Sequence, residues 1–283
     1  MTLETFFKKF ELFADAPDAV AKMRELVLDL AFSGRLLRSV NTQNSWESEP
    51  LKDLTSKIGS GSTPRGGREA YHELGTPLIR SMNVHFAGFT PKGLAFINDE
   101  QADKLKNVIV QPGDVLLNIT GASIGRVTMA PQEMAGARVN QHVTIIRPKE
   151  DLDPQFLSKF LASPRIQWWI NDVQVGATRQ AITKAMLQAF EVPHPPLAEQ
   201  KRIVAKVDEL MALCDRLEAQ QQEREARHAD LARASLARFA EAPTPANLNL
   251  LFHSSFSIHP SDLRKSILHP RRPRQTRPPR PEG

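Results

Sequence analysis

Residues 195–239 read PPLAEQKRIVAKVDELMALCDRLEAQQQEREARHADLARASLARF, and this stretch decides how the rest of the chain is organised. Two prolines are favourable where a helix begins, because the first N–H groups of a helix have no intrahelical partner. No residue from Leu197 to Phe239 breaks a helix. The stretch therefore predicts one uninterrupted helix, which at 1.5 Å per residue is about 64 Å long.

Apolar residues recur along this predicted helix at the spacing of a coiled coil. The seam steps by four, three, four and three positions through Ile203, Val207, Leu210, Cys214 and Leu217. It lapses at Gln221 and Arg224, and apolar residues return near Leu231 in a shifted register. A helix this long and this polar on its other side is not stable alone. We therefore expect it to pack along another long helix, from the same chain or from a second copy.

The region before the long helix has short apolar runs separated by Gly, Pro and Asn. The strand-like runs between residues 51 and 196 are TPLIRS, LAFIN, NVIVQPGD, VLLNITG, GRVTMAP and HVTIIRP. Residues 154–162, 164–172 and 183–189 fit helices better than strands. The predicted fold class is therefore α+β, a mixed strand-rich domain followed by a long coiled-coil helix.

The two ends of the chain resemble each other weakly. Residues 18–31 have the apolar spacing of a short amphipathic helix, and residues 263–268 can be laid over residues 23–28 as the start of a repeat. The final stretch, RRPRQTRPPRPEG, has no apolar residue and is predicted to be disordered. Five regions follow: an N-terminal helical segment (1–45), a strand-rich domain (46–196), the long helix (197–240), the start of a second repeat (241–268) and a tail (269–283).

Composition bounds the class of protein. The chain has 283 residues, 41% of them hydrophobic, which excludes disorder of the whole chain. Four of the five net positive charges fall in residues 241–283, so net charge alone does not argue for nucleic-acid binding by the strand-rich domain. No run approaches the roughly 18 apolar residues of a membrane helix. The first thirty residues lack a secretory signal. The single cysteine, Cys214, cannot form an intramolecular disulfide. We expect a cytoplasmic protein.

The sequence offers no convincing catalytic or metal motif. The segment 61–66 has the glycine spacing of a phosphate-binding loop, but Gly67 and Arg68 follow where Lys and Ser or Thr are required. The acidic residues at 99–103 fit the charged surface of a solvated loop better than a nuclease site, and the eight histidines are scattered. His194, between two prolines, is expected to pack rather than to bind metal.

Local groups of basic, amide and hydroxyl side chains point instead to contact with DNA. Residues 54–68 contain no acid, and their glycines would let backbone N–H groups approach phosphates, unless the stretch is only a flexible surface turn. Arg pairs with guanine, and Asn or Gln with adenine, through two hydrogen bonds in the major groove. The candidate DNA-binding residues are Lys57, Ser60, Thr63, Arg65, Arg68, Arg80, Asn118, Thr120, Ser123, Arg126, Arg138, Asn140, Gln141, His142, Thr178, Arg179 and Gln180.

Several of these candidates have a structural alternative. Asn118 and Asn140 would equally serve to stabilise turns, and Arg80 would equally anchor an internal carboxylate. Trp168 and Trp169 could stack on bases, but in an amphipathic helix one Trp is expected in the core and the other at an interface.

Six motifs resemble the specificity subunit of type I restriction-modification systems. They are GSGSTPRGG, PLIRSMNV, QPGDVLLNITGASIGR, NQHV, GATRQAIT and PHPPLAEQKRIVAKVDEL, and the resemblance covers about residues 1–268. It implies a target-recognition domain for double-stranded DNA, without a catalytic site or a cofactor of its own. It also implies docking to modification subunits, which carry the methyl donor, and to restriction subunits, which use ATP and Mg²⁺.

This sequence departs from the full-length family pattern, because it holds one recognition domain and one long helix. The first hypothesis is a half-size subunit that pairs with a second copy and binds a bipartite DNA site, which two-fold symmetry would make palindromic. The second is a truncated remnant that cannot assemble. The third, a stand-alone enzyme acting on nucleic acid, would need a metal or cofactor site that the motifs do not provide.

Overall fold

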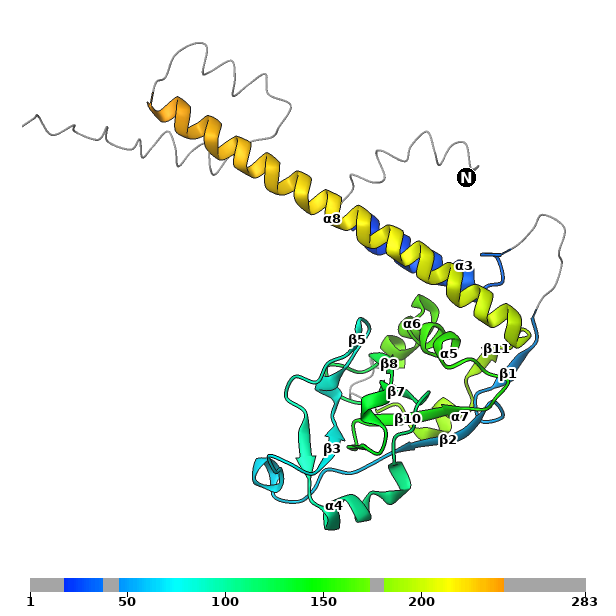
Figure 1. The fold of residues 1–283 in the computed structure, drawn as a ribbon. Helices are drawn as coiled ribbons and strands as arrows, with labels where there is room; N and C mark the ends of the chain where they lie inside the picture. Colours follow the sequence, from blue (N-terminus) through cyan, green and yellow to red (C-terminus); the bar gives the residue numbers. More distant parts are fainter. Residues whose placement is uncertain (1–17, 38–45, 174–180, 242–283) are drawn as a thin grey trace, which may run out of the picture. The chain divides into compact units, whose positions relative to one another are not determined.

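The computed structural model describes residues 18–37, 46–173 and 181–241. The chain divides into two compact units, Met1–Ala212 and Leu213–Gly283, and each is described by itself. Figure 1 shows the ribbon with its elements labelled.

A four-stranded antiparallel sheet forms the centre of the first unit, because its two middle strands are apolar on both faces. Successive side chains of a strand point to opposite faces, so Val115 and Leu117 lie in one apolar cluster and Leu116 lies in another. Ile146 and Ile145 of the neighbouring strand divide in the same way. In order across the sheet the strands are β2 (Thr55–Ser60), β10 (Val143–Pro148), β7 (Val115–Asn118) and β8 (Val127–Met129).

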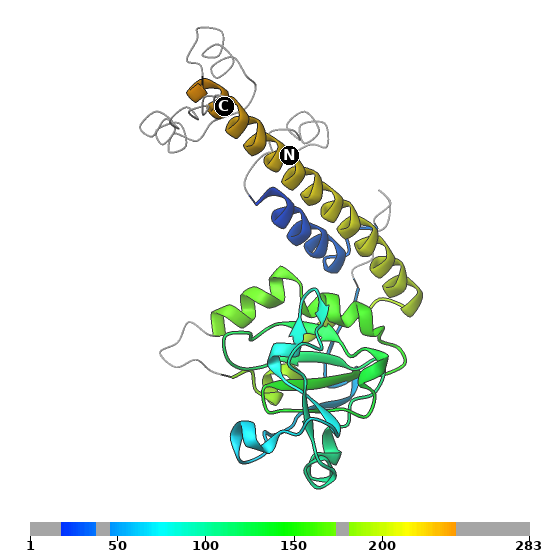
Figure 2. The ribbon, with the colours of Figure 1, turned by 60° about the vertical axis from the view of Figure 1, so that its left-hand side comes forward.

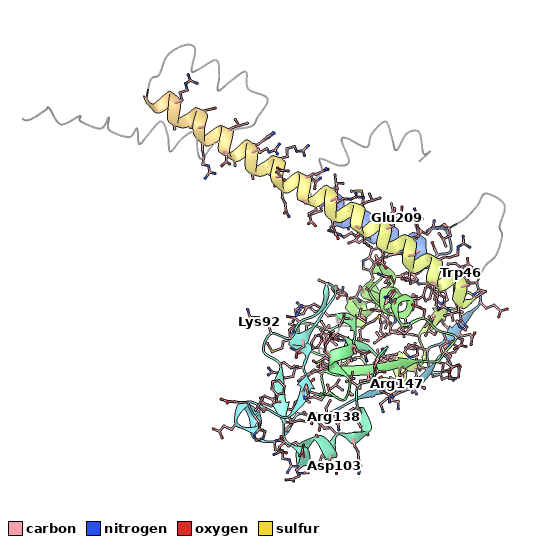
Figure 3. All side chains as sticks on the ribbon, in the orientation of Figure 1. Trp46, Lys92, Asp103, Arg138, Arg147 and Glu209 are labelled. Atoms are coloured by element: carbon pink, nitrogen blue, oxygen red, sulfur yellow. The ribbon has the colours of Figure 1, made fainter. Side chains whose placement is uncertain are left out.

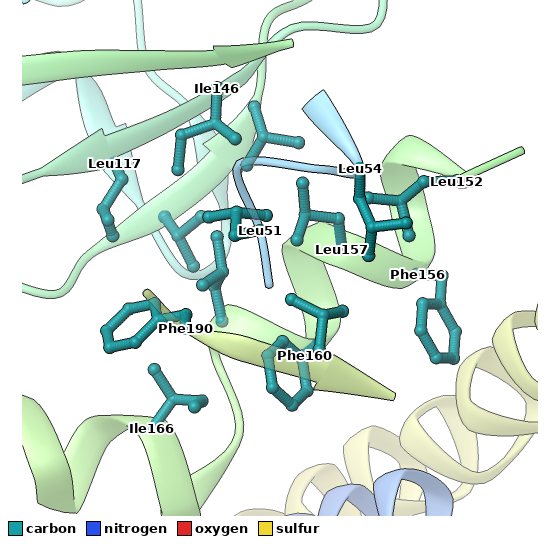
Figure 4. Close-up of a cluster of buried hydrophobic side chains, with 14 of the residues drawn as sticks. Leu51, Leu54, Leu117, Ile146, Leu152, Phe156, Leu157, Phe160, Ile166 and Phe190 are labelled. Carbon is teal, nitrogen blue, oxygen red and sulfur yellow. The ribbon is translucent and has the colours of Figure 1, made fainter. Parts of the chain in front are cut away.

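The first apolar cluster lies between this sheet and a group of helices. Figure 4 shows Leu117 and Ile146 of the sheet on one side of the cluster and Phe156, Leu157 and Phe160 of a helix on the other. The helices of the cluster are α5 (Pro154–Leu161), α6 (Pro164–Val173) and α7 (Lys184–Gln188), and an antiparallel pair of short strands from distant parts of the chain lies beside them, β1 (Ser48–Pro50) with β11 (Glu191–Pro193).

The N-terminal helix α3 (Ala19–Phe32) packs on this layer. Phe32 makes edge-on ring contacts with Phe156 and Phe160, at centroid distances of 5.2 and 5.5 Å. Both ribbon views show α3 beside the first part of the long helix (Figures 1 and 2). The short amphipathic helix predicted for residues 18–31 is therefore confirmed.

The second apolar cluster lies on the opposite face of the four-stranded sheet. It is closed by a three-stranded sheet, in which the middle strand pairs antiparallel on one side and parallel on the other. The elements on this side are β3 (Thr76–Ile79), β4 (Val84–His85), β5 (Gly88–Phe89), β6 (Ala95–Ile97), α4 (Asp99–Lys104) and β9 (Arg138–Val139). The first unit is thus an α+β domain with apolar packing on both faces of its central sheet, as predicted.

The long helix α8 (Leu197–Glu241) begins with a buried side chain that ties it to the domain. The Gln200 side chain is fully buried, and its Oε1 accepts a hydrogen bond from the Asp153 N–H at 2.8 Å. Its Nε2 donates to the carbonyl oxygens of Asp151 and Pro195, both at 2.9 Å. Because all three partners are backbone groups, this one side chain fixes the helix start against the loop that precedes α5.

His194 adds a second contact at this junction. Its Nδ1 lies 2.6 Å from Glu49 Oε1, and its Nε2 lies 3.1 Å from the Asp151 carbonyl oxygen. Burial acts to lower the pKa of His194, but the hydrogen bonds and charges of Glu49 and Asp151 outweigh burial and raise the pKa above its usual value. His194 is therefore held at this junction by Glu49 and Asp151, and no group of three or more potential metal ligands occurs among the described residues.

The predicted coiled-coil seam is wrong in its first part. Ile203 and Val207 are each 1% exposed and lie in the first apolar cluster, so they contact their own domain and not a second long helix. Spacing alone identifies the apolar face of a helix, and it does not identify what covers that face.

Most of the predicted elements occur in the structure. The three internal helices, the long helix and five of the six strand-like runs are confirmed. The run NVIVQPGD is the exception, because it forms the 3-10 helix Lys106–Val108 and a turn in which Asp114 accepts a 2.7 Å hydrogen bond from the Gln111 N–H. The acidic residues at 99–103, expected in a loop, form α4, whose start is capped by Asn98.

In the second unit the structure describes residues 213–241, which continue α8. Cys214, Ser235 and Leu236 are buried there, whereas Leu213 and Leu231 are about half exposed, at 45% and 52%. In the part of the chain that the structure describes, no helix is long and apolar enough to cross a membrane.

We predict that Gln200→Leu lowers the free energy of unfolding by about 3 kcal/mol, because the Asp153 N–H and the Pro195 carbonyl oxygen lose their side-chain partner and the Asp151 carbonyl oxygen keeps only its contact with His194. Gln220→Leu, at an exposed position of the same helix, is the control and should change stability by less than about 0.5 kcal/mol. Urea denaturation measures both values, and equal stabilities of the two variants would contradict the role of Gln200.

Candidate functional site

The register of the central sheet gathers three of the predicted DNA-binding loops at one end. Val143 pairs with Asn118, Thr144 pairs with Ser60, and Leu117 pairs with Val127. The segments 61–66, 119–126 and 140–142 therefore leave the sheet at the same end, here called the loop end.

Four polar side chains form a hydrogen-bonded network across these three segments. The Thr63 hydroxyl donates to Gln141 Oε1, Gln141 Nε2 lies 3.1 Å from His142 Nε2, and His142 Nδ1 contacts Thr120 Oγ1. Because an amide nitrogen only donates, His142 Nε2 accepts and its Nδ1 carries the proton. This loop-end network leaves one amide hydrogen of the exposed Gln141 and the hydroxyl hydrogen of Thr120 available to a ligand.

Arg126 extends the loop end toward the other edge of the sheet. Its Nη1 lies 3.4 Å from Nδ1 of His85, which belongs to the β4–β5 hairpin. Arg126 is partly exposed, and a guanidinium has five donors, so this single contact leaves it able to bind a further acceptor. His85 was not predicted from the sequence, although its position beside the turn at residues 86–87 was a usable signal.

Asn118 and Asn140 were predicted to contact bases, and the structure contradicts this. Asn118 is fully buried, and its Nδ2 donates to the Ser81 carbonyl oxygen at 2.9 Å and to Ser123 Oγ at 3.1 Å. Asn140 is 4% exposed, and its Oδ1 accepts from the His142 N–H at 3.0 Å. Both amides hold turns in place, which was the structural alternative, and the Ser123 hydroxyl takes part in the same turn.

Arg138 and Arg80 are also used by the fold. Arg138 Nε donates to the Ala102 carbonyl oxygen of α4 at 3.1 Å, and burial lowers the pKa of Arg138 while the charge of Asp103 opposes this shift. Figure 3 labels Arg138 and Asp103 on the side of the domain that carries α4, away from α6. Arg80 donates to the Gly93 carbonyl oxygen, and its Cζ lies 5.2 Å from the Tyr71 ring centroid. The side chain is therefore held by a backbone oxygen and an aromatic ring, where the sequence suggested an internal carboxylate. Both arginines are thus at least partly engaged by backbone groups of the fold.

The glycine-rich segment after β2 has a different role from the one predicted. A Cβ on Gly61 would lie 1.8 Å from the Val139 carbonyl oxygen, and the Gly61 N–H already donates to the Asn140 carbonyl oxygen at 3.1 Å. This glycine therefore permits close packing of two chain segments, and its N–H is not available to a phosphate. Lys57 and Ser60 lie on strand β2 and not in a loop.

The remaining candidates are placed as follows. Arg65 is exposed in the segment after β2. The side chain of Arg68 lies outside the described residues, and so do Thr178, Arg179 and Gln180. Of the two tryptophans, Trp169 packs edge-on against Phe190 at 4.5 Å and Trp168 is 70% exposed.

The comparison with known families identifies the class of this domain. Residues 43–225 match the model of the type I restriction modification DNA specificity domain, and the chain belongs to this family.

Individual relatives match part of their length. The chain is 29% identical over 165 residues to the type I restriction enzyme EcoBI specificity subunit of Escherichia coli, a match that covers 58% of this chain and 34% of that protein. It is 26% identical over 153 residues to the EcoKI specificity subunit of Escherichia coli strain K12, covering 50% and 31%. The chain thus spans about a third of the curated relatives that it matches.

Two solved structures have the same fold. The HsdS subunit from Thermoanaerobacter tengcongensis gives a TM-score of 0.55 at 22% identity, covering 79% of this chain and 51% of that one. The second is a chain from the structure "Structural basis underlying complex assembly and conformational transition of the type I R-M system". It gives a TM-score of 0.56 at 23% identity, and the match covers 80% of this chain and 52% of that one. The chain therefore shares its fold with these two chains.

We predict that Gly61→Ala lowers the free energy of unfolding by about 2 to 3 kcal/mol, because the added methyl group collides with a backbone oxygen that cannot rotate away. Gly59→Ala, two residues earlier on β2, is the matched control. A Cβ there meets nothing within 4 Å, so the change should stay within about 0.5 kcal/mol. Thermal or urea unfolding of the two variants tests this, and a Gly61→Ala protein as stable as Gly59→Ala would contradict it.

Proposed function

We propose that this chain is the sequence-specific DNA recognition part of a type I restriction-modification complex and is not itself an enzyme. Membership of the specificity-domain family supports the class of function. The observation that carries the assignment to a site is the loop-end network, in which Thr63, Thr120, Gln141 and His142 from three separate segments meet at one exposed end of the sheet.

The chemistry of the loop end suits contact with base edges. Gln141 offers an exposed amide, which pairs with adenine, and Arg126 offers a guanidinium, which pairs with guanine, in the major groove. The network fixes the Gln141 amide before DNA arrives, so less rotamer entropy is lost on binding. Sequence specificity then depends on these side chains, while Asn118 and Asn140 keep the turns that carry them in one conformation.

The assembly is part of the same proposal. Modification subunits would supply the methyl donor, and restriction subunits would supply ATP and Mg²⁺, so this chain would bind no cofactor of its own. The complex would act in the cytoplasm, where the DNA is.

Self-association through α8 completes the proposal, and it would give a bipartite, palindromic DNA site. Leu213 and Leu231 on the second unit are exposed apolar residues, and Leu210 and Leu217 of the predicted seam are partly exposed. The chain should sediment as a dimer at micromolar concentration, and Leu213→Asp should weaken the dimer whereas Leu74→Asp, at a position that is 84% exposed in the first unit, should not. A well-folded monomer at that concentration contradicts this part of the proposal.

Mapping of methylated sites tests the function directly. In cells that hold this chain with the modification subunit of its system, we expect methylation at one bipartite motif. Gln141→Ala should lower methylation of that motif or relax it at one base pair, since a good bidentate contact contributes about 1–3 kcal/mol of discrimination. Gln132→Ala, an exposed glutamine that follows the opposite end of β8, should leave motif and occupancy unchanged.

The outcomes separate the hypotheses. No methylation with the wild-type chain, together with no capture of the modification subunit, favours an assembly-deficient remnant. If Gln141→Ala and Gln132→Ala change methylation of the motif equally, the proposed function stands and the loop end is rejected as its site.

A further inference from the structure

A hollow of about 430 Å³ lies beside strand β2, next to the loop end. Two of its lining residues are lysines from different elements, Lys57 of β2 and Lys184 of α7, and none is acidic. The full lining is Lys57, Ile58, Gly59, Ser60, Asn107, Val108, Ile119, Thr144 and Lys184.

Within the part of the chain that the structure describes, no carboxylate pairs with either ammonium group. Lys57 Nζ donates to the Asn107 carbonyl oxygen, which is a neutral acceptor, and this leaves two of its three N–H groups for another ligand. Among the ion pairs of the described residues, neither Lys57 nor Lys184 has a carboxylate partner. Two cations without a carboxylate partner among residues 18–37, 46–173 and 181–241, together with the Ser60 hydroxyl, favour an anion with several acceptor oxygens.

The hollow is joined to the segments that would contact bases. Ser60 directly precedes the segment that holds Thr63, and Ile119 directly precedes Thr120 of the loop-end network. The Ile182 N–H donates to the Ile119 carbonyl oxygen at 2.9 Å, which fixes the start of α7, and hence Lys184, against the same segment. A ligand that extends from the network along the edge of the sheet at β2 reaches both lysines.

We propose that this hollow binds a backbone phosphate of the DNA whose bases the loop end contacts, with Lys57 and Lys184 as its cations. This inference rests on the proposed function. Phosphate contacts set the position and register of a protein on the duplex and add affinity that does not depend on sequence. The hollow therefore governs how tightly the chain holds any duplex, while the loop-end network governs which duplex it prefers.

Gly59 allows a direct test by charge. It lines the hollow, its Cβ position meets nothing within 4 Å, and its backbone is not in the left-handed region, so a larger side chain fits without strain. Gly59→Glu places a carboxylate beside the two lysines, and Gly59→Gln places a side chain of the same size without the charge. Fluorescence anisotropy with a duplex carrying the methylated motif and with a scrambled duplex of the same composition measures the effect.

We expect Gly59→Glu to weaken binding of both duplexes by about tenfold or more relative to Gly59→Gln, because a carboxylate repels phosphate and neutralises the lysines. Lys184→Ala, at an exposed side chain, should weaken both duplexes alike and reduce the slope of log K against log salt by about 0.9, the value for one phosphate contact. The preference for the motif over the scrambled duplex should not change in any of these variants.

The phosphate site is overturned if Gly59→Glu and Gly59→Gln bind DNA equally and Lys184→Ala leaves the salt slope unchanged. The proposed function still stands in that case if the wild-type chain prefers the motif duplex. A wild-type chain that binds neither duplex overturns both. Calorimetric titration of the DNA-free chain with inorganic phosphate distinguishes the source of the anion. Saturable binding that Gly59→Glu abolishes, without any effect on DNA affinity, would assign the hollow to a free anion and overturn the DNA assignment.

Discussion

The ion pair between Arg147 and Asp114 fixes the register on which the loop end depends. Arg147 lies on β10, and its Nε and Nη2 donate to the two carboxylate oxygens of Asp114 at 2.7 and 2.8 Å. Asp114 is fully buried just before β7, and Arg147 also donates to the Ile109 carbonyl oxygen at 2.9 Å. Figure 3 labels Arg147 on the sheet. Removing one partner of such a pair costs about 3–5 kcal/mol, because the other charge stays buried.

Register matters here because both faces of β10 are buried. A slip by one residue would exchange the places of Ile145 and Ile146, which belong to different apolar clusters. The same slip would move His142 and Gln141 away from Thr120 and Thr63. A charged pair at one end of the sheet thus determines which polar side chains meet at the other end, and the proposed DNA-contacting surface is a consequence of core packing.

The sequence predicted the larger elements well, since helices and buried strands depend on local patterns. The long helix, α3, α5 and the strands VLLN and VTIIRP all have a clear period or a continuous apolar run. The sequence did not reveal what covers an apolar stripe. Ile203 and Val207, predicted to form a coiled-coil seam, pack in their own domain instead. Strand β2 was missed because its residues TSKIGS are mostly polar, and it forms through pairing with β10.

The candidate site was only partly predictable for a related reason. Thr63, Gln141 and His142, which residue type suggested for DNA contact, lie at the loop end, whereas Asn118 and Asn140 have the same chemistry and are buried. Burial depends on tertiary packing, which a single sequence does not reveal. Lys184 gave no local signal, because its position beside β2 arises from the Ile182 contact with the chain that follows β7.

Hydrogen exchange with and without DNA tests most directly the claim that the loop end contacts bases. Amide exchange would be followed by mass spectrometry on the wild-type chain, free, with the motif duplex and with the scrambled duplex. The account predicts slower exchange in residues 61–66, 119–126 and 140–142 with the motif duplex, and a smaller effect with the scrambled duplex. Protection confined to residues 109–114 and 129–134 at the opposite end of the sheet, or equal protection by both duplexes, would contradict it.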